Sequence, residues 1–341
     1  MTSSTFDFSI IIGNTIKKIL TTSRREIIGV VHNAYLSHHK NLTVNPDSYF
    51  LRFPNKPESR IIALPAAIRG ERPFSGIKWI ASYPQNVAKG IPRASAVLIL
   101  NNYEIGYPYA CMEASLISAA RTAASAALAA QVLAGETRRY RQVAFIGTGI
   151  IARNILDFLM ADGCPIGEVI VHDLSSEYGH AFLSYAQKAY ALRGFFSNTL
   201  EEAVNDAELV VLATAADTPY IVSPETFSAG QVVLNISPRD LSPNIILKSW
   251  NVVDDIDHCL KADTSPHLAE KMAGHRDFIH GTLAQCILKE IVPDTHKPTI
   301  FSPFGLGVLD LAVGEMVYDQ ATASEDHIPV DDFFNEQKRW A

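Results

Sequence analysis

Two glycines and one aspartate near the middle of the chain have residue types and a spacing that could do chemistry together. Gly147 and Gly149 flank a threonine in a turn that directly follows the apolar run Val143–Ile146. A helical pattern and a second apolar run come next, and that run ends at Asp173. In such a strand–turn–helix–strand unit the turn lets the backbone approach a pyrophosphate, and the acid accepts hydrogen bonds from ribose hydroxyls.

The predicted cofactor is NAD rather than NADP, because a carboxylate at Asp173 would repel a 2′-phosphate. No arginine follows Asp173 directly. A turn that is glycine-rich for structural reasons alone is the alternative, and the agreement of strand, helix, second strand and terminal acid disfavours it. The predicted cofactor-binding residues are Gly147, Thr148, Gly149, Ile150, Ile151, Asp173, Thr214 and Asn235.

Three basic residues each lie within an apolar run. They are Arg52 in YFLRF, Lys78 in GIKWI and Arg121 in SLISAARTAAS. A cation that faces a core needs an anionic partner, since an unpaired buried charge costs several kcal/mol. Together the three could bind the carboxylates of an amino-acid substrate. The alternative is that each points to solvent or pairs within the protein.

Asp240 directly follows the predicted strand in VVLNISPRD. A carboxylate just beyond the carboxyl end of a strand could act as an acid or a base in imine hydrolysis. The alternative is an aspartate that caps a turn before Pro243. The run Asp254–Cys259 contains residue types that bind metals, but adjacent residues on an extended segment point in opposite directions, so no metal site is predicted.

Two different patterns surround these residues. Between Ser48 and Met112, short strand-like runs alternate with Pro- and Gly-rich connectors, which predicts a mostly antiparallel sheet. After Asp173, helical and strand patterns alternate, which predicts an α/β fold with a doubly wound parallel sheet of the Rossmann type. The antiparallel runs are Tyr49–Phe53, Arg60–Leu64, Ser75–Ala81, Ala96–Leu100 and Tyr107–Met112.

Two helices are predicted from local signals. Ser23 and Glu26 have the spacing of a capping box before an amphipathic helix over Arg24–His39. The apolar stretch Ala114–Ala134 approaches the length of a membrane span, but it contains Arg121. We therefore expect a buried helix there.

Composition limits the class of protein. The 341 residues are 48% hydrophobic and 19% charged, as expected for a globular protein with two domains. A net charge of −7 without a basic block argues against a nucleic-acid partner. The four cysteines include no CxxC pair, and the N-terminus has no basic and apolar leader pattern. These features predict a cytoplasmic protein without a membrane partner.

Several segments together resemble the ornithine cyclodeaminase/μ-crystallin family: GIKWI, RASAVLILNNYEIGYPYACMEASLISAARTAA, IGTGIIA, VIVHD, VVLNISPRD and SPFGLGVLD. The resemblance implies a Rossmann domain, residues 121–307, inserted into an α+β substrate-binding and dimerisation domain, residues 1–120 and 308–341. It also implies a homodimer. It places Arg52, Lys78 and Arg121 on substrate-binding positions, and Lys78 and Asp240 on catalytic ones.

Two positions depart from the cyclodeaminases of that family. Ile62 stands where they carry a glutamate, and Asn244 stands where they carry a lysine. The segments RIIALPA, GIKWIAS, MEASLIS and VVDD are more similar to the 2,3-diaminopropionate biosynthesis dehydrogenases of the staphyloferrin B type.

This narrower resemblance implies that NAD⁺ oxidises N-(2-amino-2-carboxyethyl)-L-glutamate, and that hydrolysis releases 2,3-diaminopropionate and 2-oxoglutarate. The product would enter siderophore or peptide natural-product biosynthesis. The alternatives are an ornithine or lysine cyclodeaminase, a ketimine or amino-acid dehydrogenase, and a non-catalytic NAD-binding protein.

Overall fold

The computed structural model describes residues 7–134 and 139–334, and the chain divides into two compact units. The first unit is Met1–Arg121 with Gly307–Ala341, and the second is Thr122–Leu306. The boundaries predicted from the sequence lie one residue away at each crossing. Arg121, which those boundaries put into the nucleotide domain, therefore falls within the first unit.

The first unit is built on an eight-stranded sheet with the order β16-β1-β7-β6-β5-β4-β2, and β3 also pairs with β4. Among the strand pairs that the described residues form in this sheet, only β1–β7 is parallel, so the predicted mostly antiparallel sheet is confirmed. The strands are β1 (Ser9–Ile11), β2 (Thr43–Val44), β3 (Tyr49–Phe53), β4 (Lys56–Ile68), β5 (Phe74–Ser82), β6 (Ala94–Asn102), β7 (Pro108–Glu113) and β16 (Ile328–Pro329).

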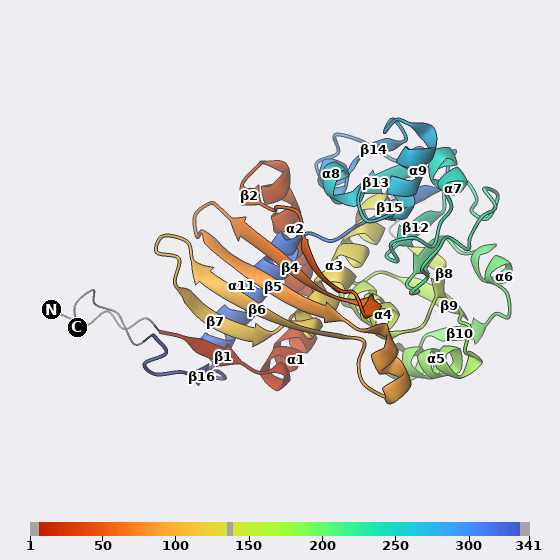
Figure 1. The fold of residues 1–341 in the computed structure, drawn as a ribbon. Coiled ribbons are helices and arrows are strands. Elements are labelled where there is room, and N and C mark those ends of the chain that lie inside the picture. Colours follow the sequence, from red (N-terminus) through yellow and green to blue (C-terminus); the bar gives the residue numbers. More distant parts are fainter. Residues whose placement is uncertain (1–6, 135–138, 335–341) are drawn as a thin grey trace. The chain divides into compact units, whose positions relative to one another are not determined.

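Helices cover one face of this sheet. α11 (Gly307–Ala323) packs on β4, β5 and β6, and also contacts α1 (Gly13–Thr22) and α2 (Arg24–His39). Figure 1 shows α11 behind the strands. A short 3₁₀ helix, η1 (Pro84–Lys89), connects β5 to β6. The buried side chains on the covered face include Leu98 and Leu100 of β6 and Met112 of β7.

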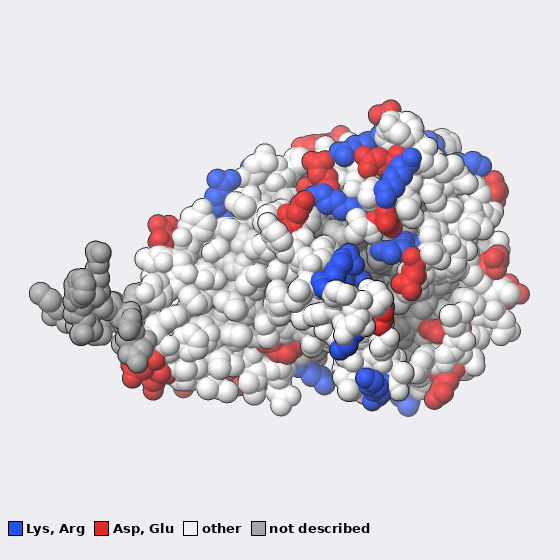
Figure 2. Space-filling model, viewed as in Figure 1, with Lys and Arg blue, Asp and Glu red and all other residues white. Residues whose placement is uncertain are grey.

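The opposite face of the sheet is apolar and uncovered. Strand register places Tyr49 and Leu51 of β3, Trp79 of β5 and Val97 of β6 on this face, and all four are at least 40% exposed. Figure 2 shows few charged side chains over β4–β7 on the side turned to the viewer. A contiguous apolar surface of this kind usually marks an interaction site.

The predicted capping box at the start of α2 is wrong, although the helix has the predicted bounds. Ser23 makes no side-chain cap bond. Its hydroxyl donates instead to Gln320 Oε1 (3.1 Å), and Gln320 Nε2 donates to Glu26 Oε2 (2.9 Å). Both side chains therefore bond to a glutamine on α11, and these bonds dock the two helices against each other.

The second unit contains an eight-stranded sheet in which every pair is parallel, with the order β10-β9-β8-β11-β12-β15-β13-β14. The predicted doubly wound sheet is confirmed. Its strands are β8 (Tyr140–Ile146), β9 (Ile166–His172), β10 (Arg193–Phe196), β11 (Leu209–Leu212), β12 (Val232–Asn235), β13 (Trp250–Val253), β14 (Ile279–Thr282) and β15 (Thr299–Ser302).

Helices accompany this sheet, and one of them crosses the boundary between the units. α3 (Ser115–Leu133) begins in the first unit and ends in the second. It is long and apolar enough to span a membrane, but 67% of its most apolar stretch is buried, as in a core helix. The others are α4 (Ile150–Ala161), α5 (Ser176–Tyr190), α6 (Leu200–Val204), α7 (Pro243–Lys248), α8 (Ile256–Cys259), α9 (Ser265–Ala273) and α10 (Leu283–Ile287).

The turn between β8 and α4 requires glycine at its first position. Gly147 has φ +81°, a conformation that side chains disfavour, and a Cβ there would lie 2.8 Å from the carbonyl oxygen of Ala213. At Gly149 a Cβ would meet no heavy atom within 4 Å. The first glycine is needed by the fold, whereas the second leaves open space at the start of α4.

The two glycines should therefore respond differently to alanine. Gly147→Ala should lower the free energy of unfolding by roughly 1–3 kcal/mol, because it adds backbone strain and a contact with Ala213. Gly149→Ala, the matched control, should change it little. Urea unfolding followed by circular dichroism measures both values. Equal stability of the two variants would contradict this interpretation of the turn.

Candidate functional site

The glycine turn is tied to the end of the neighbouring strand by the predicted acid. Asp173, just after β9, accepts from the backbone N–H and the hydroxyl of Thr148 (2.8 and 2.7 Å, both to Oδ2). Its other oxygen accepts from the backbone N–H of Ser175 (2.9 Å). The structure thus brings Asp173 to the turn. Ile150, the first residue of α4, is 61% exposed beside it.

The turn lies where the strand order of the second sheet reverses. From β8 the chain passes to β9 and β10 on one side, and β11 pairs with β8 on the other. Doubly wound sheets bind ligands at the carboxyl ends of the strands at this point. Gly147 follows β8, and Ala213 and Thr214 follow β11. Gly147 packs closely against these two residues.

The residues here fit a dinucleotide. Open space at Gly149 adjoins the start of a twelve-residue helix, where free N–H groups bind phosphate. Asn235, the last residue of β12, donates to Ser302 Oγ (3.0 Å). The side-chain amide oxygen of Asn235, Oδ1, is buried and has no hydrogen-bond partner among the described residues. Ile151, also predicted to contact the cofactor, lies in the first turn of α4.

Asp240 is held by hydroxyl groups. The Thr214 hydroxyl lies 2.8 Å from each carboxylate oxygen, and the Tyr220 hydroxyl lies 3.3 Å from Oδ2. The Asp240 side chain is completely buried, at 0% exposure. Burial raises the pKa of Asp240, and hydrogen bonds from Thr214, Ser237 and Tyr220 oppose that rise. A carboxyl with a raised pKa is suited to proton transfer near neutral pH.

Two of the three predicted cations form an ion cluster in the first unit. Lys78 Nζ lies 2.6 Å from Asp310 Oδ2 and donates to Ser118 Oγ (3.1 Å). Arg121 Nε lies 3.2 Å from the other oxygen of Asp310. Lys78 and Asp310 are buried, and the Arg121 side chain is 13% exposed. Both cations thus pair within the protein, and the cluster keeps one net positive charge.

The environment of the cluster shifts two pKa values. Burial and the charge of Arg121 lower the pKa of Lys78 to about 8, although Asp310 opposes the shift. Arg121 and Lys78 together hold the pKa of Asp310 below its usual value, despite burial. Sequence reasoning missed Asp310. The signal was available, because this acid interrupts an apolar helical run just as Arg121 does.

Arg52 lies outside the ion cluster. It is exposed on β3, with its guanidinium carbon 5.2 Å from the centre of the Phe50 ring. Its cross-strand neighbour is Arg60 of β4, so two arginines stand directly opposite each other. Register puts both on the same face of the sheet as Lys78. Like charges directly opposite each other on neighbouring strands repel.

Asp254 has a structural role. It accepts from the backbone N–H groups of Phe304 and Gly305 (3.1 and 2.6 Å). No group of metal-binding residues occurs within residues 7–134 and 139–334.

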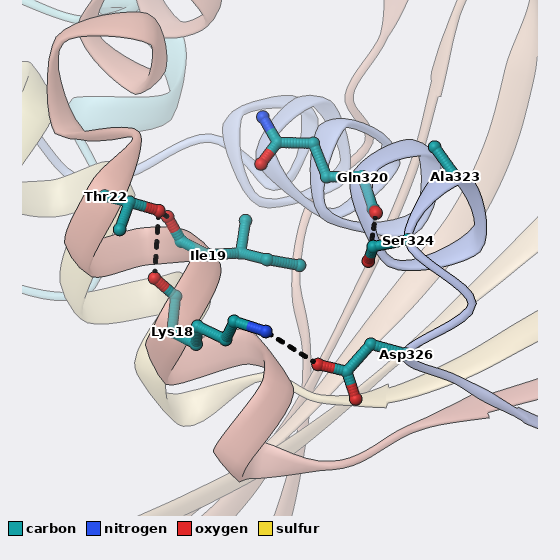
Figure 3. Close-up of a pocket in the computed structure, with 7 residues that line it drawn as sticks. All are labelled: Lys18, Ile19, Thr22, Gln320, Ala323, Ser324 and Asp326. Atoms are coloured by element: carbon teal, nitrogen blue, oxygen red, sulfur yellow. Dashed lines mark hydrogen bonds and ion pairs between the residues drawn. The ribbon is translucent and has the colours of Figure 1, made fainter.

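A surface groove lies between α1 and α11 (Figure 3), where Lys18 and Asp326 pair with each other at 3.5 Å. The remaining lining residues are Ile19, Thr22, Gln320, Ala323 and Ser324.

Relatives of known activity cover nearly the whole chain. The chain is 32% identical to N-((2S)-2-amino-2-carboxyethyl)-L-glutamate dehydrogenase of Staphylococcus aureus over 86% of its own length and 89% of the relative. It is 29% identical to the alanine dehydrogenase of Archaeoglobus fulgidus over 88% and 91%.

Solved structures share the fold. An archaeal alanine dehydrogenase dimer with bound NAD superposes with a TM-score of 0.85 at 25% identity, covering 96% of this chain and all of that one. The Δ1-pyrroline-2-carboxylate reductase of Thermococcus litoralis superposes with a TM-score of 0.86 at 21% identity, covering 95% and 100%. The model of the ornithine cyclodeaminase/mu-crystallin family matches residues 15–325. The chain belongs to this family.

Proposed function

We propose that the chain is an NAD-dependent dehydrogenase that cleaves N-(2-amino-2-carboxyethyl)-L-glutamate oxidatively into 2,3-diaminopropionate and 2-oxoglutarate. The predictions of an oxidoreductase and of NAD as cofactor are confirmed by the activities of the relatives. The observation that carries the choice of substrate is the 32% identity to the adduct dehydrogenase of Staphylococcus aureus over most of both chains. Diaminopropionate would then serve siderophore or peptide natural-product biosynthesis.

The cations of the first unit suit a substrate with three carboxylates. Lys78, Arg121 and Asp310 together carry one net positive charge, which matches one carboxylate. Arg52 and Arg60 lie opposite each other on the same face of the sheet as Lys78. Arg60 lies on β4 four residues before Leu64, which is the cross-strand partner of Lys78. Four residues span roughly 13 Å at the usual strand rise. The long side chains of Arg60 and Lys78 can reach the ends of an extended adduct of this size.

The chemistry divides between the cofactor and the protein. NAD⁺, when bound, accepts a hydride from the glutamate Cα. The cations of the first unit would hold the carboxylates of the substrate in a fixed orientation. Asp240 takes a proton from the water that adds to the resulting imine and returns it to the departing amine. Asp173 and the backbone around Gly149 hold the cofactor.

An amino-acid dehydrogenase or imine reductase is the second candidate, favoured by the alanine dehydrogenase and pyrroline-2-carboxylate reductases among the relatives. Cyclodeamination is disfavoured by Ile62. This residue pairs with Phe50 and Ile80 across the sheet, and an apolar side chain in that position cannot replace a carboxylate.

The substrate proposal predicts NADH formation from the adduct. Mixing the protein with NAD⁺ and N-(2-amino-2-carboxyethyl)-L-glutamate should raise the absorbance of NADH in proportion to the 2-oxoglutarate released. L-ornithine, L-alanine and L-proline run in parallel should give at least 100-fold lower kcat/KM, because they lack the additional carboxylates. Faster turnover of alanine or proline would favour the second candidate, and proline and ammonia from ornithine would favour a cyclodeaminase.

The role of Lys78 predicts a pH dependence. Lys78 is a cation below its pKa of about 8 and loses its charge above that value, so kcat/KM for the adduct should fall as the pH rises through about 8. Lys78→Arg should remove this alkaline limb, because guanidinium stays charged. Steady-state rates between pH 6 and 10 measure the profile. An alkaline limb that is unchanged in Lys78→Arg would assign it to another group.

The uncovered sheet face is proposed to form a homodimer interface with a second copy of this chain. It carries Tyr49, Leu51, Trp79 and Val97 as large exposed apolar side chains. A stable interface buries about 800 Å² on each partner, which is within the reach of a face built by four long strands. The archaeal alanine dehydrogenase is described as a dimer.

A charge on this face should separate the subunits. Trp79→Glu should shift the sedimenting mass from twice the chain mass towards one chain, because an unpaired carboxylate cannot be buried in an apolar contact. Met272→Glu, an exposed apolar position on α9, is the control and should leave the dimer intact. A Trp79→Glu protein that still sediments as a dimer would exclude this face as the interface.

A further inference from the structure

The acid assigned to proton transfer has no surface of its own. Asp240 is 0% exposed, and its oxygens are covered by hydroxyl groups of neighbouring residues. Asp240 therefore has no direct contact with solvent in this structure. The hydroxyls that contact it are placed to carry a proton to it.

Tyr220 is the exposed member of this group. It is 43% exposed, and its hydroxyl lies 3.3 Å from Asp240 Oδ2. Thr214 is only partly exposed, and Ser237 is buried and bonded to the backbone N–H and carbonyl of Thr214. A phenol can donate one hydrogen bond inward while its oxygen accepts another from outside.

The backbone fixes Tyr220 beside the acid. The N–H groups of Tyr220 and Ile221 both donate to the carbonyl oxygen of Asp240 (3.2 and 3.1 Å), and Ile221 forms a parallel bridge with Leu241. The contact between the two side chains therefore does not depend on a freely moving loop. Arg239, the neighbour of Asp240 in the chain, is turned to the carbonyl oxygens of Asp217 and Ala262.

We propose that Tyr220 is the proton relay between Asp240 and the reacting groups. As Asp240 accepts the phenolic proton, the Tyr220 O–H bond breaks, and a proton from the attacking water forms a new O–H bond on the same oxygen. No tyrosinate accumulates in this concerted transfer. The reverse transfer delivers the proton to the departing amine. The inference rests on the role of Asp240 in the proposed function.

The surroundings of Tyr220 agree with a neutral phenol. Burial and the nearby charge of Asp240 raise the pKa of Tyr220 above its ordinary value, so the hydroxyl keeps its proton at neutral pH. Its hydrogen bond in turn lowers the pKa of Asp240. Removal of the hydroxyl should therefore raise the pKa of Asp240.

The test compares Tyr220→Phe with Tyr103→Phe, a control of similar exposure (41%) in the first unit. Tyr220→Phe should lower kcat about 10- to 100-fold, leave the Kd for NAD⁺ unchanged and move the acid limb of the pH profile to higher pH. A merely structural role would not move that limb. Unchanged kcat and an unchanged pH profile in Tyr220→Phe would overturn the relay.

A second readout does not need turnover. Carbon-13 NMR of protein labelled at the aspartate carboxyl groups, with the Asp240 signal assigned by Asp240→Asn, measures the pKa of Asp240 directly. It should be higher in Tyr220→Phe than in the wild type and unchanged in Tyr103→Phe. If the wild type turns over no amine, the proposed function fails. If the pKa of Asp240 is the same in Tyr220→Phe as in the wild type, the relay is refuted, whether or not the proposed function holds.

Discussion

The ion cluster of Lys78, Asp310 and Arg121 holds together three elements of the first unit. It joins β5, α3 and α11 in a buried place where an unpaired charge is costly. Loss of the acid would leave two uncompensated cations and cost about 3–5 kcal/mol. Asp310 also lies in the first turn of α11, where the helix dipole favours a carboxylate. This one side chain therefore compensates both cations and ties α11 to β5 and α3.

In the proposed function, the second unit separates cofactor binding from proton transfer along one sheet edge. The turn after β8 and the acid after β9 meet through Thr148, while the segments after β11 and β12 meet through Thr214 and Asp240. Parallel strands bring all four carboxyl ends to the same edge. Residues far apart in sequence therefore lie at one edge of the sheet without long loops.

Local signals in the sequence predicted more than tertiary ones. The glycine turn and Asp173 form a single continuous unit, so spacing alone identified them. Lys78 and Arg121 stood out because each interrupts an apolar run, but Asp310 is 232 residues from Lys78, and only the folded chain pairs them. The capping box failed for the same reason, since Gln320 on α11 competes for Ser23 and Glu26. Tyr220 gave no signal, because its contact with Asp240 arises from the bridge between two loops.

The central claim, that a hydride leaves the glutamate Cα of the adduct, can be tested by isotopic labelling. N-(2-amino-2-carboxyethyl)-L-glutamate carrying deuterium at that carbon should give deuterated NADH, and the 2,3-diaminopropionate released should contain none. Mass spectrometry of both products measures the distribution. Unlabelled NADH formed from this substrate would show that another C–H bond is oxidised and would contradict the proposed reaction.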